Sequence, residues 1–176
     1  MNGTVLAWII LALVGIQRLG ELSLARRNTK ALVARGAVEI GAKHYPLIVL
    51  LHATWLLAII LLLPDPAIIN WALLVLFLVF QGLRWWVVAT LGPYWTTRII
   101  SLPGAPLVRR GPYRFFRHPN YMAVAGEIAV LPLVFGEIRV AIGFSLANAA
   151  LLAWRIRQEE TGLTPRRAYP GSDGLA

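Results

Sequence analysis

The chain has no cysteine and few charged side chains. Its 176 residues therefore hold no disulfide, thiolate metal ligand or cysteine nucleophile. Only 14% of the residues are charged and 58% are hydrophobic, which is too apolar for an ordinary soluble domain. The three histidines are dispersed and no His-Glu-x-x-His run or glycine-rich nucleotide motif occurs, so we predict no metal site and no soluble nucleotide fold.

Acidic residues are also scarce, with 8 against 17 basic residues and a net charge of +9. Such a charge is compatible with nucleic-acid binding. The basic residues, however, lie in blocks between apolar runs, which is typical of membrane topology and of contact with anionic lipid headgroups. We therefore expect membrane lipids, and no nucleic acid, as partners.

Five apolar runs organise the chain, and about 20 apolar residues (about 17 at the short end) form a helix that crosses the hydrocarbon layer. The predicted helices cover residues 4–19, 46–63, 68–91, 121–135 and 138–160. The sequence thus predicts one all-α integral membrane domain, residues 1–176, with about five transmembrane helices. No basic residue precedes the first run, so we do not expect a signal peptide.

Charge gives the orientation of these helices. All basic residues except Arg84 and Arg139 fall into three blocks: Arg18 to Lys43, Arg98 to Arg117, and Arg155 to Arg167. These blocks lie at one end of the helices, in the connections from the first to the second and from the third to the fourth, and at the end of the fifth. The positive-inside rule makes that side cytoplasmic, with the N-terminus outside and the C-terminus inside. We expect a bacterial inner (plasma) membrane protein whose functional face is cytoplasmic.

The long cytoplasmic segment 92–119 carries aromatic residues, prolines and glycines, which favour a fixed, irregular path. It ends at His118-Pro119, and Pro119 suits the first turn of the next helix. A helix N-terminus flanked by Arg114 and Arg117 can bind an anion, such as a cofactor carboxylate or a lipid acid. The alternative is a positively charged anchor with interfacial aromatics.

Polar residues at two other places stand out. Arg155 and Glu159 follow the fifth run and share a helix face, either as a site or as a surface ion pair. Within the apolar runs, where ionisable groups are costly, we expect Glu127 to pair with Arg84. We interpret His52 as a buried hydrogen-bonding residue.

Together these motifs resemble the isoprenylcysteine carboxyl methyltransferases and their bacterial relatives. The resemblance rests on Leu107-Val108, Gly111-Pro112-Tyr113, Arg117-His118-Pro119-Asn120-Tyr121 and Arg155-x-x-x-Glu159-Glu160. It extends upstream to Trp95-Thr96-Thr97-Arg98 and Glu39-x-x-x-x-His44-Tyr45-Pro46. Two departures are Ala105, where the family often has His, and Ala123, where it often has Gly.

The resemblance implies an S-adenosylmethionine-dependent methyltransferase. By position, the cofactor-binding residues would be Leu107, Val108, Tyr113, His118, Pro119, Asn120, Tyr121 and Glu159. The catalytic residues would be Arg155, Glu159 and His118, and the substrate-binding residues Arg155, Arg117 and Glu160.

The resemblance favours a lipophilic acceptor with an isoprenylcysteine-like carboxylate, for which Arg155 is the first candidate cation. A hydroxyl of a long-chain polyketide lipid (an alkylpyrone or alkylresorcinol) is the alternative, and it would need a base such as Glu159 or His118. Further alternatives are a phospholipid N-methyltransferase, an NADPH-dependent enzyme similar to sterol reductases, and a non-enzymatic transporter or scaffold.

Overall fold

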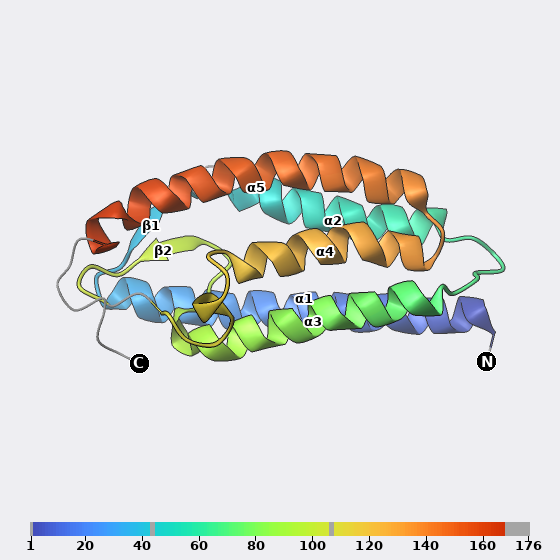
Figure 1. Ribbon diagram of the computed structural model, residues 1–176, viewed down its shortest axis with the longest axis horizontal. Helices are drawn as coiled ribbons and strands as arrows, with labels where there is room; N and C mark the ends of the chain where they lie inside the picture. Colours follow the sequence, from blue (N-terminus) through green and yellow to red (C-terminus); the bar gives the residue numbers. More distant parts are fainter. Residues whose placement is uncertain (1, 43–44, 106–107, 168–176) are drawn as a thin grey trace.

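Five helices run along the long axis of the molecule, and successive helices point in opposite directions (Figure 1). The computed structural model describes residues 2–42, 45–105 and 108–167, with the side chains of the last helix described as far as residue 159. The helices are α1 (Gly3–Ala34), α2 (Tyr45–Leu62), α3 (Trp71–Leu91), α4 (Pro119–Val134) and α5 (Ile138–Arg167). α1, α2, α3 and α5 are long and apolar enough to cross a membrane, and α4 is a shorter apolar helix. The predicted all-α integral membrane fold is confirmed.

The first helix is longer than its apolar run suggests. α1 continues to Ala34, so the sequence placed its end at residue 19 too early. Its extension is held by burial of Ala25 and Leu32. The Asn28 amide also donates to the backbone oxygens of Gly92 (3.1 Å) and Trp95 (2.8 Å). At about 1.5 Å per residue α1 exceeds the hydrocarbon thickness, and its second half supports the long loop.

The other helix boundaries differ from the predicted ones by smaller amounts. α3 begins at Trp71 rather than residue 68, because the Asn70 side chain caps it by accepting from the amide of Leu73 at 3.2 Å. α4 begins at Pro119 itself, which occupies the first turn, where no amide hydrogen is needed. α5 extends to Arg167 rather than residue 160.

The segment between α3 and α4 follows the expected irregular path, with short elements in it. These are η2 (Gly92–Tyr94), β2 (Ile99–Ser101) and η3 (Gly111–Arg114). β2 pairs antiparallel with β1 (Val38–Ile40), with Glu39 opposite Ile100. The sequence did not predict this sheet, because strands of three residues are too short to show an alternating pattern.

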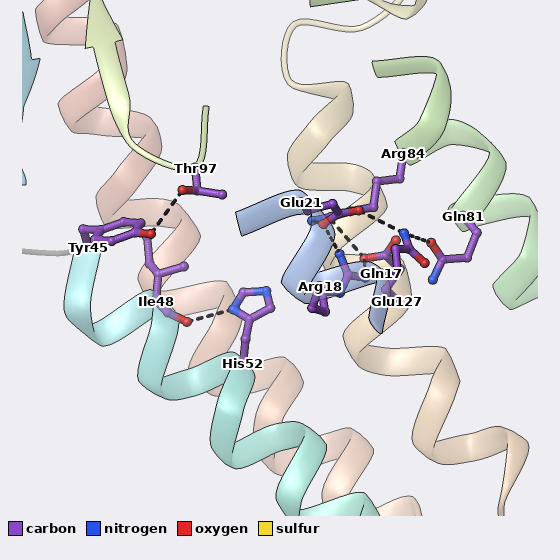
Figure 2. Close-up of polar contacts among 10 residues, drawn as sticks. All are labelled: Gln17, Arg18, Glu21, Tyr45, Ile48, His52, Gln81, Arg84, Thr97 and Glu127. Carbon is purple, nitrogen blue, oxygen red and sulfur yellow. Dashed lines mark hydrogen bonds and ion pairs between the residues drawn. The ribbon is translucent and has the colours of Figure 1, made fainter. Parts of the chain in front are cut away.

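A buried ionic cluster joins α1, α3 and α4 (Figure 2). The Arg84 guanidinium donates to Glu21 through Nε (2.7 Å) and Nη2 (2.5 Å), and to Glu127 through Nη1 (3.2 Å). Arg18 bridges the same two carboxylates, at 2.9 Å from Glu21 and 2.7 Å from Glu127. The predicted pairing of Glu127 with Arg84 is thus confirmed, whereas Arg18 is more than a topological anchor.

α4 packs closely against α3 on one side and α5 on the other. Ile128 and Leu131 of α4 are buried in the core, and the Trp55 indole of α2 donates to the backbone oxygen of Ile128 at 3.2 Å. Gly126 faces α3, where a Cβ atom would lie 2.4 Å from the Phe80 ring. This contact requires a residue without a side chain.

We expect Gly126→Ala to lower the free energy of unfolding by about 1–3 kcal/mol, because the added methyl group overlaps the Phe80 ring. Gly82→Ala in α3 is the matched control, since a Cβ there meets nothing within 4 Å. Thermal unfolding of both variants in detergent tests this. Equal melting temperatures for the two variants would contradict the close packing of α3 on α4.

Between α4 and α5, burial raises the pKa of Glu137 from 4.5 to about 7. The side chain is 8% exposed, and neither carboxylate oxygen has a hydrogen-bond partner among the described residues. Between pH 4.5 and 7 the folded protein therefore binds more protons at this group than the unfolded chain, so its stability falls as the pH rises through that window.

Glu137→Gln removes this ionisation. We expect the variant to gain about 1–2 kcal/mol over the parent at pH 8 and to lose that advantage near pH 4.5. Melting temperatures of the two proteins across this range measure the difference. A pH-independent difference would show that Glu137 does not titrate in this way.

Candidate active site

A partly open cavity of about 390 Å³ lies among α1, α2 and α5, with α4 and the long loop completing its wall. Most of its lining surface is apolar. The charged residues that line it are Arg155 and three members of the ionic cluster (Arg18, Glu21 and Arg84). The other polar lining residues are Tyr45, His52, Thr96, Thr97, Asn120, Tyr121 and Asn148. A cavity of this kind can hold an apolar chain beside a few directing polar groups.

The centre of the site is a hydrogen-bonded trio contributed by α4 and α5. The Tyr121 hydroxyl donates to the Glu159 carboxylate and accepts from Arg155 Nε at 2.9 Å. The Arg155 guanidinium also lies 5.6 Å from the centre of the Tyr121 ring. The short α4–α5 hairpin explains why these residues, 34 and 38 positions apart, meet.

His118 completes this arrangement at the start of α4. Its ring stacks on Tyr121 with 5.4 Å between ring centres, and its Nδ1 lies 4.0 Å from Glu159. Because His118 is the residue before Pro119, its backbone ends the loop and its side chain points back over the first turn of α4. A carboxylate is thus surrounded by a phenol, an imidazole and a guanidinium.

The loop before β2 supplies residues that the sequence-based site assignment did not include. Arg155 Nη2 donates to the backbone oxygen of Thr97 at 2.8 Å. The Thr97 hydroxyl donates to the Tyr45 oxygen at 3.2 Å, as Figure 2 shows. Arg98 then lies 4.4 Å above the Tyr45 ring and forms an ion pair with Glu39 at 2.8 Å. The signal for these residues was present, because they fall in the upstream segments that carry the family resemblance.

Tyr113 approaches the same carboxylate from η3. Burial, together with the negative charge of Glu159, raises the pKa of the Tyr113 phenol, so this hydroxyl stays protonated. η3 is fixed to α3 by Gly111, whose φ of +58° favours glycine and where a Cβ would lie 2.4 Å from the Thr90 hydroxyl. Tyr113 therefore offers a neutral aromatic face and no base.

Other sequence-predicted site residues take different positions. Pro119 is buried at the start of α4, Val108 is half-buried in the loop, and Arg117 is exposed. Asn120 lines the cavity, and its buried Oδ1 has no hydrogen-bond partner among the described residues. Leu107 and the side chain of Glu160 lie outside the described residues. The functional roles of all these residues stay predictions.

A metal ion has no evident place in this arrangement. Within residues 2–42, 45–105 and 108–167, no group of three or more histidine, aspartate or glutamate side chains is placed to hold one.

The fold and the site define a helical membrane protein with a partly open cavity that is lined by Arg155 and Tyr121. The model of the isoprenylcysteine carboxyl methyltransferase (ICMT) family matches residues 72–165, more than half of the chain. The chain belongs to this family, as its motifs predicted. The protein is therefore a membrane methyltransferase by family.

Two relatives extend the similarity over nearly the whole chain. Uncharacterized protein YpbQ of Bacillus subtilis (strain 168) is 37% identical over 160 residues, covering 89% of this chain and 95% of its own length. An uncharacterized protein of Haemophilus influenzae (strain ATCC 51907 / DSM 11121 / KW20 / Rd) is 28% identical over 155 residues, covering 84% and 88%. No solved structure matches the chain significantly.

Tyr121→Phe tests the trio directly. Removing the hydroxyl leaves Arg155 Nε and the Glu159 carboxylate each without one partner, so we expect a loss of about 1–3 kcal/mol of stability. Tyr94→Phe is the control, because Tyr94 is exposed and contacts Arg35 only through its ring face, at 5.9 Å. Thermal unfolding in detergent distinguishes them. A Tyr121→Phe protein as stable as the control would contradict the claim that the Tyr121 hydroxyl bonds Arg155 and Glu159.

Proposed function

We propose that this protein is an S-adenosylmethionine-dependent O-methyltransferase that acts on a lipophilic acceptor. The single observation that carries the proposal is the Tyr121–Arg155–Glu159 trio, placed where a largely apolar cavity meets the loop side of the bundle. Membership of the family indicates methyl transfer, and the largely apolar cavity indicates a lipophilic acceptor.

The residues at the trio fit a cationic, polar cofactor. The buried Asn120 Oδ1 is a ready acceptor for a ligand donor, and the Glu159 carboxylate favours a nearby positive charge. Tyr113 and His118 place aromatic faces beside that carboxylate. When bound, S-adenosylmethionine supplies an activated methyl group, and the protein's task is to align it with the acceptor.

Arg155 is the residue we assign to the acceptor oxygen. Its Nε and one Nη2 hydrogen are used by Tyr121 and Thr97, which fixes the plane of the guanidinium and leaves further donors. A fixed guanidinium beside the cavity suits an oxyanion, whether an isoprenylcysteine-like carboxylate or an ionised hydroxyl. The aliphatic walls would take the acceptor's tail from the bilayer.

Positive-inside topology would place the trio and the loop at the cytoplasmic face of the inner membrane, where S-adenosylmethionine is available. The acceptor would then enter sideways from the lipid while the cofactor enters from water. The apolar cavity would take the acceptor and the polar loop side of the bundle would take the cofactor, and these two surfaces meet at Arg155.

The purified protein should transfer a labelled methyl group from S-adenosylmethionine to a lipid extract or to defined acceptors with long apolar tails. We expect Arg155→Ala and His118→Ala each to lower the rate by about 10²-fold or more, because the site loses a group that orients a reactant or stabilises its charge. Arg157→Ala, two residues further along α5 and exposed, is the matched control.

Unchanged transfer by both Arg155→Ala and His118→Ala would show that the site is assigned wrongly. Tight NADPH binding without S-adenosylmethionine binding would instead place the protein with the reductases. Methylation of a phospholipid amine alone would replace O-methylation by N-methylation.

A further inference from the structure

The cavity is lined by a buried amide that lies away from the trio, that of Asn148 on α5. Asn148 is only 3% exposed, and within the part of the chain that the structure describes its side chain forms no hydrogen bond. A carboxamide offers two donor hydrogens and an acceptor oxygen. Burial of such a group without a partner costs free energy, so the amide is suited to a bound molecule that supplies the missing partner.

The position of Asn148 relative to Arg155 follows from helix geometry. Asn148 precedes Arg155 by seven residues in α5, and both side chains line the cavity. Seven residues are about two turns of helix, so the two side chains share one face of α5 and lie about 10 Å apart along it. Leu151 and Leu152 line the wall between them. The cavity therefore has a second polar level, deeper in the bundle than Arg155.

His52 reaches a similar depth from α2, which packs against α5. Thr97 ties the two helices together near the loop, because its carbonyl oxygen accepts from Arg155 and its hydroxyl donates to Tyr45. His52 follows Tyr45 by seven residues, and both line the cavity. His52 thus also lies about two turns, or about 10 Å, further into the bundle than the loop end.

The His52 ring presents a hydrogen-bond acceptor at this depth. Its Nδ1 is 2.8 Å from the backbone oxygen of Ile48, which can only accept, so Nδ1 carries the proton and Nε2 is the acceptor. The ring stays neutral, because the charged groups near it are Arg18, Arg84 and Arg155. Figure 2 shows the ring projecting from α2 on the side of the ionic cluster.

We propose that Asn148 and His52 form a second binding subsite, which takes a hydroxyl on the acceptor's tail about 10 Å from the oxygen that is methylated. This inference rests on the proposed function, because Arg155 holds the other end of the acceptor. A neutral hydroxyl fits both residues, since it donates to His52 Nε2 and accepts from the Asn148 amide. The subsite takes no part in methyl transfer. It selects acceptors whose tail carries this group over those with a plain hydrocarbon tail, which would leave the Asn148 amide unpaired.

A series of carboxylate probes tests the subsite without methyl transfer. The probes are hexadecanoic acid and its derivatives with a single hydroxyl at successive positions of the chain. Calorimetry in detergent gives their dissociation constants for the wild type, Asn148→Leu, the double variant Asn148→Leu with Leu152→Asn, and Ser145→Ala. Leu152 lines the cavity about one turn closer to Arg155. Ser145 is the matched control, because it is a polar residue of α5 that does not line the cavity.

We expect the wild type to bind the probe whose hydroxyl lies about 10 Å from the carboxylate about tenfold more tightly than probes hydroxylated nearer either end, because only that hydroxyl finds partners. Asn148→Leu should reduce this preference to less than about threefold. It should still bind hexadecanoic acid at least as tightly as the wild type, which shows that the variant is folded. The double variant should move the preferred hydroxyl about 6 Å toward the carboxylate, and Ser145→Ala should keep the wild-type preference.

Equal affinity of the wild type for all the hydroxylated probes would overturn the subsite. A preference that Asn148→Leu leaves unchanged, or that Ser145→Ala removes, would overturn it as well. Failure of the proposed function gives a different result. If Arg155→Ala binds every probe as tightly as the wild type, Arg155 does not hold the acceptor oxygen.

Discussion

The rest of the structure depends on a neutral cluster of two arginines and two glutamates buried inside an apolar bundle. Arg84 contacts both Glu21 and Glu127, and Arg18 contacts the same pair, so α1, α3 and α4 are joined at one level. Removing one member would leave an uncompensated charge, which typically costs about 3–5 kcal/mol. In hydrocarbon the helices gain little from the hydrophobic effect, so such polar contacts help determine which helices meet.

This constraint has a direct consequence for the site. α4 is held by Glu127 at its third turn, and the first turn of α4 carries Asn120 and Tyr121. The cluster also forms part of the cavity wall through Arg18, Glu21 and Arg84. The same ionic contacts therefore position the site and border the space in which we propose that the acceptor binds.

The site itself depends on segments far apart in the sequence. The α4–α5 hairpin brings Tyr121 to Arg155 and Glu159, and these contacts follow from a short connection between two helices. The Thr97 carbonyl accepts from Arg155, and the loop that carries Thr97 leads into β2, which pairs with β1, and is bonded to α1 through Asn28.

Much of this was predictable from the sequence, and the exceptions have physical reasons. Apolar length and charge placement predicted the helices, and the cost of a charge in lipid predicted that Glu127 pairs with Arg84. The second half of α1 was missed because charged residues interrupt its apolar ones, so it forms no apolar run, although Ala25 and Leu32 are buried and Asn28 bonds the loop. Arg18 was counted as a topological anchor, since charge counting cannot show whether a side chain points to water or to a buried carboxylate. The cavity depends on side-chain directions, which one sequence does not encode in a readable pattern.

The most direct measurement for the account is an experimental structure of the protein with S-adenosylhomocysteine bound. The account predicts that the ligand's sulfur lies beside the trio of Tyr121, Arg155 and Glu159, with its reacting side directed toward the cavity that His52 lines. A ligand bound away from Glu159, or with its sulfur turned away from that cavity, would contradict it.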